Sequence, residues 1–440
     1  MDDHGRKMTG RFLFLGVLCL AALCLCLATP ALKAQAKTIN VKKYGAKAGT
    51  DSTEAIQKAL DEAAKTGTAK KPTVVKIPKG TFLINKTLYI GSNTTLKLTK
   101  KTVIKKTEKF GLLNMLSTRP GTKGGYDDSS NITVNGGVWD GEFKLFTSTS
   151  GGSIFFFAHA TNVKITGAEI RNNFGTHLVE LGGVKDCTIS DCKLHGFKAK
   201  GKDVEKEAIQ LDITHDENIL PHGEPFDDTP CRNLTVRNCE IYDYPRAIGS
   251  HMAVEGIVHI GLNVENCDLH DLKAAAVYTF ATEEVKVSGC TIKNAQIGIS
   301  FRTGTIGDSS IILKRNKGVA AMNVTPGGNV FSGNTITSIA DEGIAVYGTT
   351  ASTSGNTIEN TGKNAVTVSY GSELEMDGDD IRSTKAIGVS VTNDSGVSMK
   401  NVRISDSAKI GLYVGPGCKA SAEGGEIKNA GSHGINAVSS

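Results

Sequence analysis

The chain has little net charge, few aromatic residues and no long apolar run after its N-terminal region. The formal charge is +5 over 440 residues, aromatic residues make up 6% and there is one tryptophan. A charge this small does not indicate nucleic acid as a partner. Beyond the N-terminal region no segment is apolar over enough residues to span a bilayer. Helical periodicity is also absent from almost all of the sequence.

The N-terminal region has the pattern of a secretory signal. Basic residues precede an apolar run that ends near Leu27, and the small-residue motif Ala34-Gln35-Ala36 follows. A membrane anchor is the alternative, but the run is at the lower limit for a spanning helix and Pro30 follows it. We predict a signal peptide over residues 1–36, a secreted domain over residues 37–440 and no membrane association after cleavage.

A short phrase that ends in an aliphatic residue recurs along the chain. The C-terminal copies are GNTI (333–336), GNTI (355–358), GDDI (378–381), NVRI (401–404) and GGEI (424–427). Their closing isoleucines are spaced 22, 23, 23 and 23 residues apart. Earlier copies are GAEI (167–170), DCKL (191–194), NCEI (238–241), NCDL (266–269) and GCTI (289–292). Two wider gaps, of 47 and 44 residues, are expected to hold about two repeats each.

A second short strand follows each phrase, as in EAIQLD (207–212) and AAVYTF (275–280). A period near 23 residues built from short strands indicates a solenoid in which each turn contacts only its neighbours. A β-sandwich would need hairpin turns and would not keep so constant a period. The sequence therefore predicts an all-β, single-stranded parallel β-helix.

Cysteine placement agrees with this coil. Three of the ten cysteines lie in the predicted signal, and an odd number, seven, remain. Cys192, Cys239, Cys267 and Cys290 each precede the closing aliphatic residue by two positions, so they are expected to stack inside the coil as free thiols. Disulfides are the alternative. Further along, Asn334 and Asn356 hold the same position and are expected to form an amide ladder.

One helix is expected, over residues 51–67, with Asp51 or Ser52 as its cap and Gly67 at its end. Its apolar face, formed by Ile56, Ala59, Leu60 and Ala63, is suited to cover the open end of a solenoid. No such cap is apparent after the final repeat, where the coil either stops or is covered by a partner subunit. The oligomeric state is left open.

The opening of the predicted domain resembles a known family. INVKKYGAKAGTDSTEAIQKALDEA, VVKIPKGTFLI and TLKL, within residues 38–104, are similar to the start of pectate-lyase-superfamily proteins. Polygalacturonases and phage tailspikes share this opening, and NGGVWDGE (135–142) resembles a further polygalacturonase phrase. The resemblance implies a right-handed parallel β-helix and action on polysaccharides.

Titratable and aromatic residues gather on the second strands of consecutive turns within residues 170–302. Strands in adjacent turns lie about 4.8 Å apart, so matching positions become neighbours in space. The residues in these columns are His177, Glu180, Glu207, Gln210, Asp212, Arg246, His251, Tyr278, Phe280, Ser300 and Arg302. An ordinary solvated face with ion pairs is the alternative. The mixture of acid, imidazole, guanidinium and aromatic groups favours a sugar site.

Catalytic roles are assigned to four of these residues. Glu180 and Asp212 lie on a diagonal of roughly 8 Å, within the separation of roughly 6.5–9.5 Å that suits an inverting glycosidase. Asp212 would orient His251 or raise its pKa. Glu207 stands where the polygalacturonase pattern has its first aspartate.

Substrate binding is assigned to the others. Arg246 and Arg302 suit a uronate carboxylate, because guanidinium pairs with carboxylate in a bidentate way. Tyr278 and Phe280 are expected to stack on sugar rings. His177 and Gln210 are expected to be further substrate-binding residues. The remaining polygalacturonase catalytic pattern is not matched, because Arg246 replaces its histidine and Ser300 its arginine.

The chemistry is left open between several reactions. Hydrolysis and β-elimination of an acidic polysaccharide are the leading options, with His251 or an arginine as the base in the second. A calcium ion held by Asp216, Asp227 and Asp228 is a candidate cofactor. LDITHDE (211–217) resembles the Asp-Pro-His-Asp of alginate epimerases. Uronate epimerisation is therefore a further possible reaction.

Non-catalytic functions are the main alternative. Residues 329–440 are plain repeats rich in Ser, Thr and Gly with few site-like residues, which suits a glycan-binding or surface-adhesion coil. A phage tailspike is a third option that the signal sequence disfavours.

Overall fold

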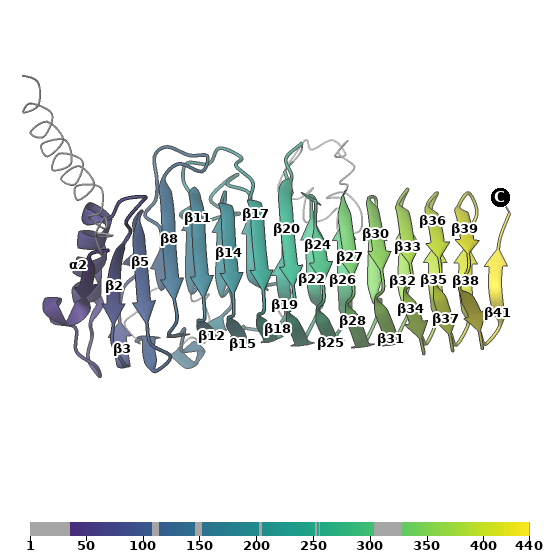
Figure 1. The fold of residues 1–440 in the computed structure, drawn as a ribbon, viewed down its shortest axis with the longest axis horizontal. Coiled ribbons are helices and arrows are strands. Elements are labelled where there is room, and N and C mark those ends of the chain that lie inside the picture. Colours follow the sequence, from purple (N-terminus) through teal and green to yellow (C-terminus); the bar gives the residue numbers. More distant parts are fainter. Residues whose placement is uncertain are drawn as a thin grey trace, which may run out of the picture. The chain divides into compact units, whose positions relative to one another are not determined.

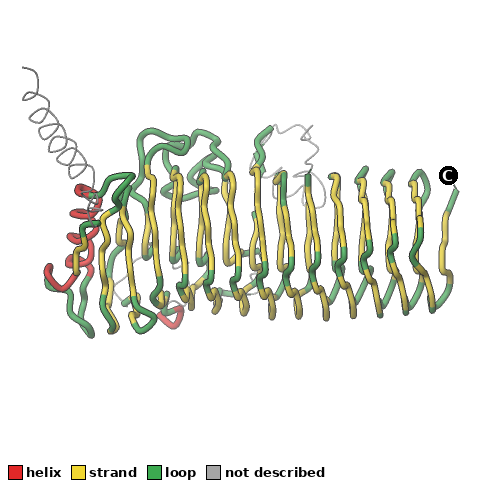
Figure 2. The backbone as a smooth tube through the Cα atoms, viewed as in Figure 1, coloured by secondary structure: helices red, strands yellow, loops and turns green. Residues whose placement is uncertain are grey.

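The computed structural model describes residues 36–107, 114–145, 152–201, 205–250, 253–254, 256–302 and 328–439. Residues 37–440 form one compact unit. Within the described residues this unit is a stack of coils, each built from three short parallel strands (Figures 1 and 2). The right-handed parallel β-helix that the sequence predicts is confirmed. No described helix is long and apolar enough to cross a membrane.

The three strands of a coil belong to three sheets that run the length of the stack. Sheet I contains, in order, β1 (Thr38–Asn40), β2 (Thr73–Ile77), β5 (Thr94–Leu98), β8 (Ser129–Asn135), β11 (Ala160–Thr166), β14 (Lys185–Ser190), β17 (Arg232–Arg237), β20 (His259–Glu265), β24 (Lys286–Ser288), β27 (Asn329–Ser332), β30 (Thr350–Ser354), β33 (Glu373–Asp377), β36 (Gly396–Lys400) and β39 (Lys419–Glu423), with β23 (Thr282–Glu283) paired to β20.

Sheet II follows sheet I in each coil, after a tight corner. It contains β3 (Gly80–Ile84), β6 (Thr102–Lys106), β9 (Val138–Asp140), β12 (Glu169–Phe174), β15 (Lys193–Lys198), β18 (Glu240–Tyr244), β21 (Asp268–Leu272), β25 (Thr291–Ala295), β28 (Thr335–Ile339), β31 (Thr357–Thr361), β34 (Asp380–Arg382), β37 (Arg403–Ser405) and β40 (Glu426–Lys428).

Sheet III closes each coil and carries the candidate site. It contains β4 (Leu88–Tyr89), β7 (Leu116–Ser117), β10 (Phe155–Ala158), β13 (Val179–Gly182), β16 (Glu207–Asp212), β19 (Arg246–Gly249), β22 (Ala275–Phe280), β26 (Ile297–Arg302), β29 (Ile344–Tyr347), β32 (Val366–Ser369), β35 (Ile387–Val391), β38 (Ile410–Val414) and β41 (His433–Ala437).

The repeated phrase forms the corner between sheets I and II. Its first residue is Gly, Asn or Asp and has a positive φ, for example 53° at Asn238 and 60° at Gly333. These residue types tolerate the left-handed conformation that the corner requires. The second residue of the phrase points inward, and the closing aliphatic residue starts the core column of sheet II, where Ile358 pairs with Ile336 and Ile381.

The two wide gaps in the repeat hold one coil each, so the expectation of two repeats in each is wrong. Leu194 pairs directly with Ile241, and Ile292 pairs directly with Ile336. In the first gap the extra residues are loops between strands, the longest of which covers residues 213–231. A loop at a corner lengthens the chain without changing the register of the strands that flank it.

The helix α2 (Thr53–Thr66) packs against the first coils through the predicted apolar face, whose residues Ile56, Ala59, Leu60 and Ala63 are fully buried. The side chain that caps the first turn of the helix is Asp51 and not Ser52, because the Asp51 carboxylate accepts a hydrogen bond from the backbone N–H of Thr53. Two 3₁₀ helices are also described, η1 (Val41–Tyr44) and η2 (Phe143–Leu145).

The predicted cysteine column is confirmed. Every cysteine in the described residues is free, and Cys192, Cys239, Cys267 and Cys290 are buried in successive coils. The backbone N–H of Cys267 lies 3.5 Å from the Cys290 sulfur. Burial also raises the pKa of the Cys231 thiol to about 12, so it stays protonated.

The inward column continues as the predicted amide ladder and ends in a buried carboxylate. The Asn334 amide donates to Asn356 Oδ1 at 2.9 Å, and the Asn356 amide donates to Asp379 Oδ1 at 2.8 Å. Thr353 donates to the other Asp379 oxygen. Burial raises the pKa of Asp379, although hydrogen bonds from Thr353 and Asn356 oppose the rise.

Thiol labelling tests the cysteine column. We expect Cys418, which is half-buried, to react in the native protein, whereas the six buried cysteines react only after denaturation. Mass spectrometry of peptides labelled before and after denaturation counts the reactive cysteines in each state. A disulfide between any two of the seven cysteines would contradict the structure.

Replacement of the buried carboxylate tests the ladder. Because the folded-state pKa of Asp379 is raised, its contribution favours folding at low pH and is lost as pH rises through that pKa. Asp379→Asn, which extends the amide ladder, should therefore increase the free energy of unfolding at pH 7 by on the order of 1–2 kcal/mol. The gain should disappear near pH 4, as measured by denaturant titration. Asp380→Asn, one residue away on the outer face, is the control and should show no such gain.

Candidate functional site

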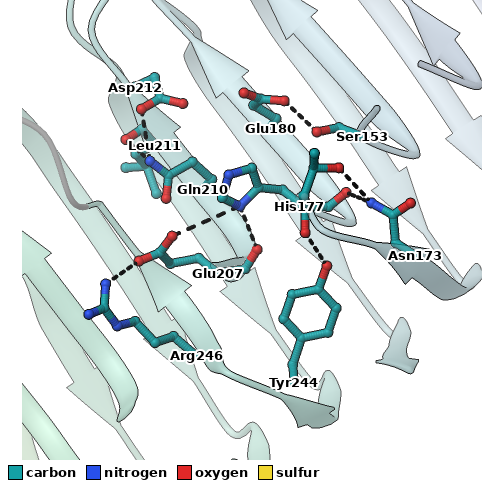
Figure 3. A network of polar contacts seen from close by, with 11 residues as sticks. Ser153, Asn173, His177, Glu180, Glu207, Gln210, Leu211, Asp212, Tyr244 and Arg246 are labelled. Carbon is teal, nitrogen blue, oxygen red and sulfur yellow. Dashed lines mark hydrogen bonds and ion pairs between the residues drawn. The ribbon is translucent and has the colours of Figure 1, made fainter. Parts of the chain in front are cut away.

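Sheet III brings the predicted columns together in the expected register. Glu180 pairs with Gln210, which pairs with Gly249, and Tyr278 continues the same column. Glu207 pairs with Arg246 in a neighbouring column. Residues separated by 30 or more positions in the chain therefore become neighbours on one wall, as Figure 3 shows for β13, β16 and β19.

A local irregularity places both columns on the outer face. Ala276 and Val277 are consecutive, yet both belong to the main core, whereas Ala275 and Tyr278 pack together in a separate outer cluster. Strict alternation along a strand would have placed residues 275 and 278 on opposite faces. The same arrangement in β16 and β19 turns Glu207 and Arg246 outward.

Glu207 is the centre of a buried polar network. Its side chain is fully buried, and Oε1 accepts a hydrogen bond of 2.9 Å from Arg246 Nη1 (Figure 3). His177 Nδ1 lies 2.7 Å from the Glu207 backbone oxygen and 3.9 Å from Oε2. The Arg246 guanidinium also lies over the Tyr278 ring, 4.0 Å from its centre. An ion pair with a cation–π contact fixes the position of the arginine.

A second group of carboxylates lies further along the same strands. Ser153 Oγ donates to Glu180 Oε2, and Gln210 Nε2 donates to Asp212 Oδ1 at 2.8 Å (Figure 3). Gly182, two residues after Glu180, pairs with Asp212. Glu180 and Asp212 thus have the diagonal relation that the sequence predicts.

Most of the polar side chains on this face are buried in the structure. Gln210 is fully buried, Asp212 and Phe280 are each 2% exposed, and Glu180 is half-buried. Described residues from two connecting segments pack on this face or beside it. Ile219 and Leu220 pack on β10, and Ala253 packs in the outer cluster on β22.

Three buried polar atoms on this face have no hydrogen-bond partner among the described residues. They are Gln210 Oε1, Arg246 Nε and Ser300 Oγ. Buried polar atoms without partners are uncommon, because each one loses its interaction with water without compensation. An acceptor, a donor and a hydroxyl are the groups that would bind sugar hydroxyls or carboxylates.

The side chains of two predicted site residues, His251 and Arg302, lie outside the described part of the chain. His251 lies outside the described residues, so its contact with Asp212 stays a prediction. The backbone of Arg302 pairs with Phe280 in sheet III, as the register requires, but its side chain lies outside the described part of the chain.

The three aspartates predicted to bind calcium have protein partners. Asp216 accepts the backbone N–H groups of its own turn, and Asp228 contacts His215. Asp227 accepts hydrogen bonds from Gly125 N and Thr214 Oγ1, both at 2.7 Å. The described residues contain no group of three or more His, Cys, Asp or Glu that could hold a metal ion. Calcium binding stays a prediction without an assembled ligand set.

The sequence reasoning missed a second polar cluster, in the loops beside the site. His159, the residue after β10, is 1% exposed and contacts two loops. Burial would raise the pKa of Asp227 nearby, but hydrogen bonds from Gly125, Thr229 and Thr214 and the proximity of His159 lower it. The only signal in the sequence is a histidine directly after the apolar strand FFFA (155–158).

Comparisons with known proteins define the class. The chain belongs to the rhamnogalacturonase A/epimerase, pectate lyase-like family, whose model matches residues 38–300. A right-handed β-helix region matches residues 314–440. The predicted membership of the pectate-lyase superfamily is confirmed.

Individual relatives are more distant. The plasmin and fibronectin-binding protein A of Streptococcus pneumoniae is 24% identical over 226 residues, which are 46% of this chain and 30% of that protein. The chain thus spans less than a third of the length of this curated relative.

Solved structures share the fold. The crystal structure of PfbA, a surface adhesin of S. pneumoniae, has a TM-score of 0.61 at 16% identity and covers 86% of this chain and 92% of its own. The A-module of the mannuronan C-5 epimerase AlgE4 from Azotobacter vinelandii has a TM-score of 0.52 at 14% identity and covers 90% of this chain and 100% of its own.

Substitutions in the central ion pair test the network. Glu207→Gln leaves the buried Arg246 uncompensated and should lower the free energy of unfolding by about 3–5 kcal/mol. The double variant Glu207→Leu/Arg246→Met should recover much of the loss, because no charge stays buried. Denaturant titration of the single and double variants measures both effects.

The control for this cycle is the exposed pair Lys193–Glu240 on sheet II, where Glu240→Gln should cost less than about 1 kcal/mol. A Glu207→Gln variant as stable as the wild type would mean that Glu207 does not neutralise Arg246.

Proposed function

We propose that the protein is secreted and acts on an acidic, uronate-containing polysaccharide at the outer face of β13, β16, β19 and β22. The observation that carries the proposal is the polar network of Figure 3, in which three consecutive coils direct carboxylates, an imidazole and a guanidinium to one face. The unpaired atoms of Gln210, Arg246 and Ser300 support it, since a bound glycan would satisfy them.

The proposed chemistry centres on Glu180 and Asp212. Glu180 is the more exposed of the two carboxylates and accepts a hydrogen bond from Ser153. Asp212 is oriented by Gln210. This difference in environment suits an acid and a base with separate roles. Arg246, held by Glu207 and Tyr278, is the proposed contact for the substrate carboxylate.

A second candidate function is adhesion without catalysis. The similarity in fold to the pneumococcal surface adhesin PfbA extends over most of both chains. The burial of Glu207 and Gln210 is also compatible with a purely structural role for these two side chains. Under this alternative the protein binds a surface glycan or protein and leaves it unchanged.

Assays on a panel of uronate polysaccharides test the proposal. We expect loss of activity of at least about 100-fold in Glu180→Gln and Asp212→Asn, the scale of general acid–base catalysis. Glu375→Gln is the matched control, because Glu375 is an exposed glutamate that lines a shallow groove on the outer face of sheet I. Full activity in both site variants would contradict the assignment.

The products distinguish the reactions. Ultraviolet absorbance from an unsaturated uronate means β-elimination, and new reducing ends without it mean hydrolysis. Inversion of configuration at C5 of the uronate, detected by nuclear magnetic resonance without chain cleavage, means epimerisation. Glycan binding with none of these products supports the adhesin.

A further inference from the structure

His159 joins three parts of the chain beside the candidate site. It directly follows β10, has a left-handed φ of 49° and donates its backbone N–H to Gly182 at 3.0 Å. Its ring lies between two long loops, the first over residues 118–128 and the second over residues 213–231. Figure 2 draws these connections in green along one edge of the coils.

Both ring nitrogens of His159 face carbonyl oxygens. Nδ1 lies 2.8 Å from the Gly125 oxygen, and Nε2 lies 3.0 Å from the Gly223 oxygen and 2.8 Å from the Pro225 oxygen. A carbonyl oxygen accepts hydrogen bonds and cannot donate them. In a neutral imidazole one nitrogen carries a lone pair, which would point at an oxygen at hydrogen-bond distance. Only the imidazolium form donates from both nitrogens.

The charged groups of the second loop favour this form. Asp227 interacts electrostatically with His159 and accepts the backbone N–H of Gly125, so it also ties the two loops together. Glu224 adds a carboxylate oxygen that is buried with no hydrogen-bond partner in the described part of the chain.

The first loop contributes Asp128, Lys123 and Tyr126. The carboxylate of Asp128 accepts backbone N–H groups of its own loop, including that of Lys123. Tyr126 donates to the backbone oxygen of Pro230 in the second loop and accepts from Arg232. In the sequences of the two loops, Asp and Glu residues outnumber Lys and Arg residues.

The second loop forms a wall of the candidate site. Leu220 packs against Phe156 and Ala158 on the outer face of β10, and Phe156 pairs with Glu180. A side chain at Gly182 would meet Leu220 Cδ2 at 2.0 Å, so the leucine fills the space beside Asp212. The position of this loop therefore decides how much of the carboxylate pair reaches solvent.

We propose that His159 carries a proton on both ring nitrogens and that its hydrogen bonds to the two loops hold the loop 213–231 closed against sheet III. We call these hydrogen bonds the His159 pin. Loss of one proton removes a charge-assisted hydrogen bond and turns a lone pair toward a carbonyl oxygen, which releases the loop. The pin follows from the contacts alone. Its effect on access to Glu180 and Asp212 rests on the proposed function.

Hydrogen exchange of the whole protein tests the pin without any glycan. After correction for intrinsic rates, peptides from residues 118–128 and 213–231 should exchange at least about tenfold faster at about pH 8.5 than at about pH 5.5, a ratio within the strength of a charged hydrogen bond. Peptides from β33 to β38 should not change. His159→Asn, which tolerates the left-handed backbone, should show fast exchange of both loops at either pH.

His195→Asn, a histidine substitution on sheet II, is the control and should retain the wild-type pH response in the loops. Nitrogen chemical shifts of labelled histidine in the wild-type protein give a second measurement, independent of any variant. Both His159 nitrogens should be protonated at about pH 5.5. A neutral His159 with both loops protected at that pH would overturn the proposal, and so would loop exchange that does not depend on pH. Failure of the glycan assays with a confirmed pin would reject the proposed function alone.

Discussion

The in-register pairing of parallel coils is the constraint on which the rest of the structure depends. Each coil adds one strand to each of three sheets, so a residue meets its equivalent one coil later, at about 4.8 Å. The aliphatic columns, the thiol column and the amide ladder are all consequences of this register. So is the outer network, in which Glu207 meets Arg246 although 39 positions separate them.

Register also explains where variation is allowed. A strand cannot gain a residue without turning its inward side chains outward, whereas a corner can hold a loop of any length. The loop 213–231 uses this freedom, and its apolar residues Ile219 and Leu220 then cover part of sheet III. The same coil thus provides part of the polar wall and a loop that covers its neighbour β10.

Periodic features of the fold were predictable, and aperiodic ones were not. The isoleucine spacing predicts the coil. The position two residues before each closing aliphatic residue predicts that Cys239 and Asn334 stack inside it. The wide gaps were misjudged because loops leave no periodic trace. The convergence of Glu180, Gln210 and Tyr278 follows from alignment of the repeats, but Leu220, which packs on the neighbouring β10, lies in a loop that no repeat describes. His159 was missed because its partners are backbone carbonyl groups, which no sequence pattern reveals.

A crystal structure of the protein soaked with acidic oligosaccharides tests the central claim most directly. The account predicts sugar density on the outer face of β13, β16 and β22, against Glu180 and the unpaired atoms of Gln210 and Ser300. Density confined to another surface, such as the groove beside Glu373 and Glu375 on sheet I, would contradict it.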